Sequence, residues 1–358
     1  MKKIILSLTL LITSAFFLSG CGVVKTISCI GKDSVKIFNW GDYIDPAIIK
    51  GFEKENDVCV KFVTFDSNEA AITKMKTESF DVIIPSDYAV EQMVEEDLLE
   101  LMDWSKITNL NKETDLAEGL KAILNTMDFN LLDYGVPYFW GNVGILYNKE
   151  KITQAELDTL QWDIFKENHK IAFYDSPRDG FMVALKQLGY QMNTKNEAEL
   201  QAAESWLMGL SGKKNVSFLT DEILDDMPNL KYDLALSYSG DAIYIMSEQE
   251  KLGFYVPTKG TNVWADAMVI PKNATNKDLA YAFINYASSY KSSLLNTSYV
   301  MYSTPRKDVY NELITDGSDF YQYRDAYEVT INPNDEVFRY LPEVKSFTSD
   351  AWARVRIA

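Results

Sequence analysis

Acidic and aromatic residues stand directly after three short apolar segments in the N-terminal quarter of the chain. The first segment is followed by Trp40, Asp42 and Tyr43, the second by Asp66, Ser67 and Asn68, and the third by Ser86, Asp87 and Tyr88. Carboxylates form strong hydrogen bonds with cations, and aromatic faces attract cations while covering apolar carbon chains. Each loop alone has an ordinary composition, but three of them together favour a binding site.

The segments that carry these loops alternate between strand and helix patterns. Strand patterns cover residues 35–39, 58–65 and 81–85, and helix patterns cover 46–52, a stretch ending at 77, and residues from about 90. Pro46 suits a first helical position, and Asp66 with Glu69 three residues later resembles a capping box. This order predicts a parallel α/β sheet, in which ligands bind beyond the carboxyl ends of the strands. The three loops lie at those ends.

A second alternation of strands and helices covers about residues 144–256 and repeats the same arrangement. Within it, strand patterns at 171–174 and 234–237 precede helix patterns that end at 189 and 249. Beyond it, a third strand pattern at 263–270 precedes a helix pattern at 277–290. Asp179 follows the first of these strands, and Tyr238 and Asp241 follow the second. Trp264 and Asp266 are two residues apart on the third strand, so both side chains face the same side. Asp266 is therefore the strongest single candidate for a ligand-binding residue.

The first twenty residues have the pattern of a secretory signal. Lys2 and Lys3 precede an apolar run at 4–18, which is too short for a comfortable membrane span, and small residues lead to Cys21. This order resembles a bacterial lipobox, whose cysteine carries lipid and begins the mature chain; the alternative is a buried cysteine beside a chance apolar stretch. We expect a signal peptide at 1–20, lipid on Cys21, a tether at 21–33, and a position at the outer face of the cell membrane or in the periplasm.

Composition narrows the possible functions. The chain of 358 residues has 35 basic and 52 acidic residues and a formal charge of −17. No basic stripe exists to neutralise phosphates, which excludes most nucleic-acid partners. The acidity is compatible with a cationic ligand, although many proteins are acidic only for solubility. No stretch beyond the first twenty residues has the ~18 apolar residues of a spanning helix, so transport would need a separate membrane partner.

Metal binding and a disulfide scaffold have little support in the sequence. His169 is the single histidine and lies in a polar turn, so we expect it at the surface and expect neither a metal nor a cofactor. Cys29 and Cys59 are the two cysteines beyond Cys21. Two free thiols are the preferred interpretation, and a bridge between them stays open.

An ordered set of motifs along nearly the whole mature length resembles the periplasmic polyamine-binding proteins of ATP-binding-cassette (ABC) importers. The motifs are FNWGDYI (38–44), DSNE (66–69), DVIIPS (81–86), VPYFWG (136–141), LGY (188–190) and WADAMVIP (264–271). The resemblance implies a two-lobed periplasmic-binding-protein-like α/β fold of type II with the ligand in the interlobe cleft. It further implies a first lobe of 34–140 plus 265–310 and a second lobe of 141–264 plus 311–358.

The resemblance also implies the residues of the site. Aromatic walls would come from Trp40, Tyr43, Tyr88, Tyr238, Trp264 and Tyr302, charge from Asp42, Asp179, Asp241 and Asp266, and a hydrogen bond from Ser86. The ligand would be spermidine or putrescine, passed by a monomeric protein to the membrane permease of an ABC importer. Ser176 and Tyr238 depart from the spermidine type, and Asp241 matches the putrescine type. Trp264 matches the spermidine type better, so the pattern is mixed and the ligand's length stays open. Arg178 would orient a neighbouring carboxylate.

Other functions have weaker support. A binding protein for another small cationic solute is the nearest alternative within the same fold. A lipid-anchored glycosidase could use paired carboxylates, but the sequence has no Gly-x-Ser-x-Gly, His-Glu-x-x-His or phosphate-loop motif, so we do not expect an enzyme. A structural lipoprotein or adhesin would not need acidic and aromatic clusters at several strand ends.

Overall fold

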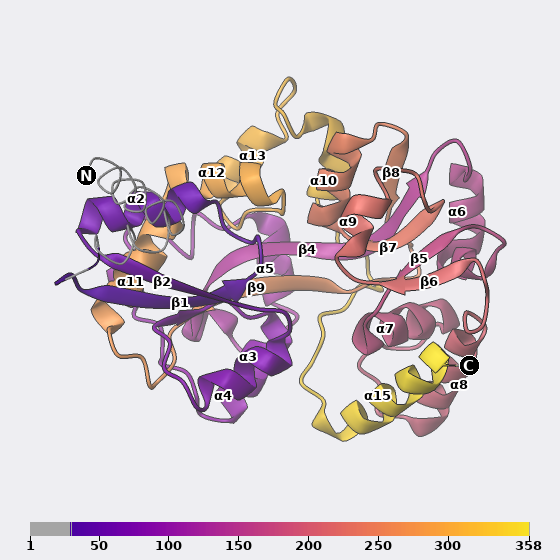
Figure 1. Cartoon of the computed structure of the whole chain (residues 1–358), viewed down its shortest axis with the longest axis horizontal. Helices are drawn as coiled ribbons and strands as arrows, with labels where there is room; N and C mark the ends of the chain where they lie inside the picture. The colour runs from indigo at the N-terminus through magenta and orange to yellow at the C-terminus, as the bar shows by residue number, and fades with distance from the viewer. Residues whose placement is uncertain (1–28, 30, 358) are drawn as a thin grey trace, which may run out of the picture.

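The computed structural model describes residue 29 and residues 31–357. Cys21 and the expected signal peptide lie outside the described residues, as does most of the expected tether. Figure 1 shows two α/β lobes side by side, joined by two long strands. The expected two-lobed α/β fold is confirmed.

Within the described residues, nine strands form one sheet that runs through both lobes in the order β2-β1-β3-β9-β4-β7-β5-β6, with β8 on β4. The strands are β1 (Ser34–Trp40), β2 (Cys59–Phe65), β3 (Val82–Ile83), β4 (Gly135–Asn148), β5 (Ile171–Tyr174), β6 (Val216–Leu219), β7 (Leu234–Tyr238), β8 (Leu252–Tyr255) and β9 (Val263–Val269). Pairing is parallel among β1, β2 and β3 and among β5, β6 and β7. The parallel sheet expected in each half is therefore confirmed.

Strands β4 and β9 connect the lobes. Every residue of both strands is buried. Residues 135–142 of β4 pair antiparallel with β9, and residues 143–148 pair with β7 and β8. The partner of β4 changes at one point, so the two parts of the sheet meet at a narrow connection made of two strands.

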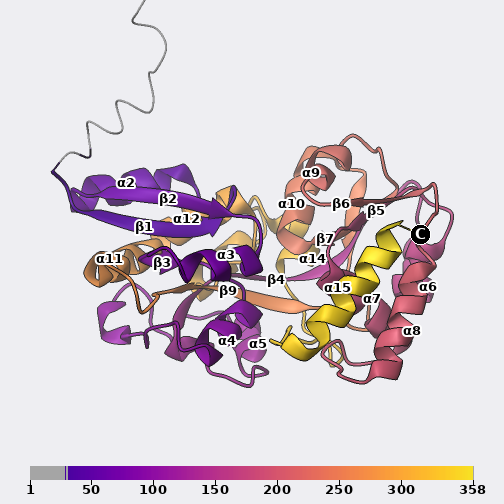
Figure 2. The same cartoon turned by 60° about the horizontal axis from the view of Figure 1, so that its bottom comes forward.

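Helices cover the faces of the sheet in both lobes (Figure 1). They are α2 (Pro46–Asn56), α3 (Asn68–Met75), α4 (Asp87–Glu95), α5 (Glu118–Leu124), α6 (Gln154–Leu160), α7 (Pro177–Leu188), α8 (Glu197–Met208), α9 (Glu222–Asp226), α10 (Ser239–Glu248), α11 (Lys277–Ala287), α12 (Tyr290–Val300), α13 (Lys307–Leu313), α14 (Arg324–Tyr327) and α15 (Pro342–Ile357), and the 3-10 helices are η1 (Trp104–Lys106), η2 (Leu131–Asp133), η3 (Gln161–Lys166) and η4 (Tyr321–Tyr323). The terminal helix α15 packs against α7 and α8 (Figure 2). Each lobe has its own large apolar core.

Three local predictions differ from the structure at element ends. Ser67, and not Asp66, caps α3, because its Oγ accepts a hydrogen bond of 3.2 Å from the N–H of Ala70. Helix α4 begins at Asp87, three residues before the expected start near 90. The helix expected to end at 290 ends at Ala287, and the side chain of Ser289 caps a separate helix that begins at Tyr290. The starts of α3 and α12 depend on single side-chain hydrogen bonds to the capping serines, which apolar periodicity does not encode.

Cys29 and Cys59 form a disulfide with their Cα atoms 5.7 Å apart, so the expectation of two free thiols was wrong. The cause is the parallel pairing of β1 and β2, which places Ser34 opposite Cys59. The N–H of Cys59 also donates to the carbonyl of Asp33. The chain entering β1 therefore passes beside the start of β2, although 30 residues separate the two cysteines in sequence.

Candidate functional site

Four carboxylates meet where the two lobes join, each at the end of a strand or on a connecting strand. Asp87, Asp179 and Asp266 are 1%, 3% and 4% exposed, and Asp241 is half-buried. Among the described residues, none of the four forms a salt bridge within 4.0 Å. Burial of an uncompensated carboxylate is costly, because the charged form loses its hydration. A cation entering between the lobes would remove that cost.

Asp266 on β9 has one oxygen bonded and one oxygen free. Tyr43 Oη donates to Asp266 Oδ2 at 2.8 Å. Asp266 Oδ1 is buried and has no hydrogen-bond partner among the described residues, and the same holds for Trp264 Nε1 on the same strand. Burial raises the pKa of Asp266 to about 7, although the hydroxyl groups of Ser86 and Tyr43 lower it. Asp266 Oδ1 is therefore a hydrogen-bond acceptor without a donor. An ammonium group would supply that donor.

Asp179 and Asp241 each face a tyrosine. Tyr238 Oη lies 3.1 Å from both oxygens of Asp179 and donates to them. Burial raises the pKa of Asp179. Burial also raises the pKa of Asp241 to about 6, against a side-chain hydrogen bond with Tyr302 that lowers it. Both carboxylates lie in the first turn of a helix, α7 and α10, directly after a strand of the second lobe.

Asp87 is a buried acid. From the sequence it was a candidate either for the rim of the binding site or for capping a helix. Its Oδ1 accepts from the N–H of Tyr88 at 2.7 Å, and its Oδ2 accepts from the N–H of Ala265 at 3.0 Å. Burial, together with the charge of Asp266, raises its pKa to about 8, against the two backbone hydrogen bonds, which lower it. Asp87 thus ties α4 to the connecting strand β9. In the sequence, Asp87 looks like the other acidic residues that follow apolar segments. Only its burial in the folded chain distinguishes it from those that are exposed.

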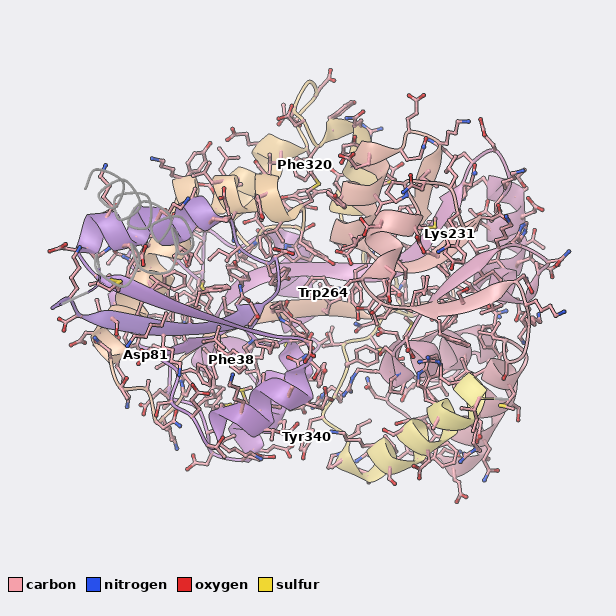
Figure 3. The ribbon with its side chains drawn as sticks, viewed as in Figure 1. Phe38, Asp81, Lys231, Trp264, Phe320 and Tyr340 are labelled. Carbon is pink, nitrogen blue, oxygen red and sulfur yellow. A yellow bond between two sulfur atoms is a disulfide. The ribbon has the colours of Figure 1, made fainter. Side chains whose placement is uncertain are left out.

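Five aromatic rings form a continuous row between the carboxylates. The row begins at Tyr43, whose ring centroid lies 5.7 Å from that of Tyr302, and continues from Tyr302 to Trp264 at 5.2 Å. It then runs from Trp264 to Tyr238 at 6.0 Å and ends at Tyr174, 5.6 Å from Tyr238. Trp264 marks the middle of this row between the lobes in Figure 3. Tyr174 was not expected, although its position at the end of a strand before Asp175 was a signal for it.

Gly240 makes this packing possible. A Cβ at this position would lie 2.3 to 2.5 Å from ring atoms of Tyr302. Any other residue would therefore displace the tyrosine from the first turn of α10. The Ser239–Gly240–Asp241 turn consequently presents a carboxylate while leaving room for the aromatic wall.

The remaining expected residues lie apart from this row. Trp40 is half-buried, packs on Phe65 with centroids 4.5 Å apart, and has a buried Nε1 without a partner among the described residues. Ser86 is not a member of the row but forms an isolated antiparallel bridge with Asp266, and its Oγ accepts from Asn68 Nδ2 at 3.1 Å. Asp42 is exposed, with a left-handed backbone of φ 48°, unlike the buried Asp87, Asp179 and Asp266.

The ring face of Tyr88 is already covered. The guanidinium of Arg178 lies 3.7 Å from the Tyr88 centroid. Arg178 also forms an ion pair with Glu69 at 3.1 Å. Arg178 was expected to orient a carboxylate, and Glu69 is the carboxylate that it contacts directly.

Residue 29 and residues 31–357 contain neither a metal-binding cluster nor a membrane-spanning helix. In that part of the chain, no group of three or more His, Cys, Asp or Glu side chains could hold a metal ion. No helix there is long and apolar enough to cross a membrane. His169 is half-buried in the bend before β5.

Comparison with known proteins identifies the family. Residues 47–323 match the family of bacterial extracellular solute-binding proteins. The chain is 31% identical to a spermidine/putrescine-binding periplasmic protein of Salmonella typhimurium over 261 residues, which cover 71% of this chain and 72% of that protein.

Solved structures agree with this assignment. A spermidine/putrescine ABC transporter substrate-binding protein of Streptococcus pneumoniae is 31% identical with a TM-score of 0.72, covering 90% of this chain and 98% of that one. A lipoprotein of Treponema pallidum is 25% identical with a TM-score of 0.77, covering 90% and 99%. The chain therefore belongs to the bacterial extracellular solute-binding protein family.

Proposed function

We propose that this protein captures a linear polyamine, spermidine or putrescine, between its lobes and delivers it to the permease of an ABC importer. The observation that carries the proposal is the buried Oδ1 of Asp266, which has no hydrogen-bond partner among the described residues and lies at one end of an aromatic row. The acids beside it form hydrogen bonds but no salt bridge within the described part of the chain. The names of the relatives in Salmonella and Streptococcus support the same ligand class.

The chemistry of a polyamine fits this arrangement. Its terminal ammonium groups need carboxylate acceptors, and its methylene chain needs flat apolar walls. Asp266 would accept one ammonium, and Asp179 or Asp241 would accept another. The rings of Trp264, Tyr302 and the tyrosines beside them would cover the carbons between the charges. Trp40, Tyr43, Ser86 and Tyr88 would complete the first-lobe side, and Asp42 would lie outside the contact.

Lobe closure would couple binding to transport. The first lobe, proposed as 34–140 plus 265–310, supplies Asp266, whereas the second lobe, proposed as 141–264 plus 311–358, supplies Asp179 and Asp241. A ligand that contacts both lobes shifts an open–closed equilibrium toward the closed form. The permease would recognise that form, and the protein would act as a monomer without enzymatic activity.

We further propose that lipid on Cys21 holds the protein at the outer face of the membrane or in the periplasm. The lipobox pattern before Cys21 and the similarity to a lipoprotein of Treponema pallidum support this location. Replacing Cys21 by serine should release the protein from the membrane fraction. Retention of the variant there would contradict lipid anchoring.

Titration calorimetry tests the ligand. The purified protein should bind putrescine or spermidine with micromolar or tighter affinity, about 8 kcal/mol or more, whereas lysine serves as a control for a shorter, zwitterionic cation. Absence of heat with putrescine, spermidine and spermine at millimolar concentration would refute the proposal. Binding of a different small cation alone would favour the alternative of another cationic solute.

A further inference from the structure

Three cations of the second lobe contact acidic residues of the first lobe on one side of the interlobe connection. Arg178 and Lys345 contact Glu69 at 3.1 and 3.9 Å, and Arg339 contacts Glu91 and Asp128. The anions lie on or near α3, α4 and α5, and the cations lie on α7, on α15 and just before α15. We call these six residues the interlobe clasp.

Arg178 forms the part of the clasp nearest the binding site. Its guanidinium lies against the ring of Tyr88 at 3.7 Å and near the ring of Phe338 at 5.3 Å, in addition to its ion pair with Glu69. Arg178 directly precedes Asp179 on α7. A planar guanidinium stacked on a ring and paired with a carboxylate holds a definite orientation. The first turn of α7 is therefore held against the first lobe at the residue next to a site carboxylate.

Arg339 forms the strongest part of the clasp. Its Nε lies 3.1 Å from both oxygens of Glu91, a residue only 7% exposed, and Nη1 pairs with Asp128. The N–H of Tyr340 donates to Glu91 at 2.8 Å, at the lower edge between the lobes in Figure 3. The N–H of Arg339 donates to Asn193 of the second lobe at 3.0 Å, so Arg339 moves with that lobe.

We infer that Arg178 and Arg339 are positioning residues for ligand capture, because their ion pairs favour the closed arrangement of the lobes without contacting the ligand. The inference rests on the proposed function and deepens it. Apparent affinity equals the affinity of the closed form multiplied by its population. Loss of the clasp should therefore weaken binding of every ligand by the same factor, whereas loss of a ligand contact changes the preference between ligands.

The test uses a double variant, Arg178→Gln with Arg339→Gln, and calorimetry with putrescine and spermidine. The affinity for both should fall about tenfold or more, with their ratio unchanged. Small-angle X-ray scattering should show a larger radius of gyration for the ligand-free variant than for the ligand-free wild type. Saturating ligand should bring both proteins to the same radius. Circular dichroism confirms that the variant is folded.

Two matched variants sharpen the result. Exchanging the charges in Arg339→Glu with Glu91→Arg should recover affinity relative to Arg339→Glu alone. Lys272→Gln removes an exposed ion pair to Asp97 within the first lobe and should change nothing. Unchanged affinity and scattering in the double variant, or a loss confined to one ligand, would overturn the inference. If the wild type binds neither polyamine, the proposed function fails, while the scattering comparison still decides the clasp.

Discussion

Replacing Asp266 with asparagine removes a charge from the centre of the proposed site while keeping the size of the side chain. Tyr43 can still donate to the asparagine oxygen that takes the place of Asp266 Oδ2, which now accepts at 2.8 Å. The group at the position of the unpaired Asp266 Oδ1 becomes neutral, so an ammonium group bound there loses a charge-assisted hydrogen bond. Such a bond contributes about 1.5–3 kcal/mol, so polyamine affinity should fall by roughly 10- to 150-fold.

The pH dependence of binding gives a second, independent magnitude. Burial raises the pKa of Asp266 to about 7, so about one-tenth of the free protein carries this charge at pH 6 and about nine-tenths at pH 8. An ammonium group favours the ionised form and lowers the pKa, so binding releases protons near neutral pH. Affinity should therefore rise about tenfold from pH 6 to pH 8 through Asp266 alone. The Asp266→Asn variant should lack this part of the rise.

Titration calorimetry at pH 6, 7 and 8, in two buffers of different ionisation enthalpy, measures both the affinity and the released protons. Asp42→Asn is the matched control, because Asp42 is an exposed aspartate of the same region and its loss should change affinity less than about twofold. Equal affinity of the wild type and Asp266→Asn would remove Asp266 from the ligand site. An unchanged pH dependence in the variant would show that another group titrates.

The remaining predictions concern stability and packing. Folding raises the pKa of Asp87 to about 8 and of Asp266 to about 7, so the native state holds protons that the unfolded state has released. The melting temperature of the ligand-free protein should therefore rise from pH 8 to pH 5. A fall of the melting temperature over this range in calorimetric scans would contradict these pKa shifts. Gly240→Ala should lower the affinity at least about tenfold, because the new methyl group displaces Tyr302. Gly41→Ala is the neutral control, since a Cβ at Gly41 would meet open space. Cys29→Ser should destabilise the protein by about 3–4 kcal/mol in denaturant titrations and abolish the effect of reductant; equal stability of variant and wild type would show that the bridge contributes little.

Much of the local structure follows from short-range patterns. The strand expected at 171–174 and the helix that follows it to Gly189 occur as β5 and α7, because a run of apolar, β-prone residues and a glycine in left-handed conformation are local signals. The placement of acidic and aromatic residues at strand ends could likewise be predicted from the sequence, since parallel strands bring their carboxyl ends together. The lengths of short elements were less predictable, as β3 with its two residues shows.

Burial separated residues that look alike in the sequence. Asp42 and Asp87 both follow an apolar strand beside aromatic residues, yet Asp42 is exposed and Asp87 is 1% exposed. The difference comes from β9, whose Ala265 N–H lies over Asp87 from a position 178 residues away. No local pattern encodes such a contact.

The sequence by itself determined the family, the strand and helix order, and the presence of acidic and aromatic loops at strand ends, because these depend on residue types and near spacing. Tertiary structure alone decided which carboxylates are buried without a partner, that Cys29 meets Cys59, and that Arg339 reaches Glu91 across the lobes. These features depend on contacts between segments far apart in the chain. They also depend on the loss of hydration, which shifts a carboxyl pKa only when the whole fold surrounds it.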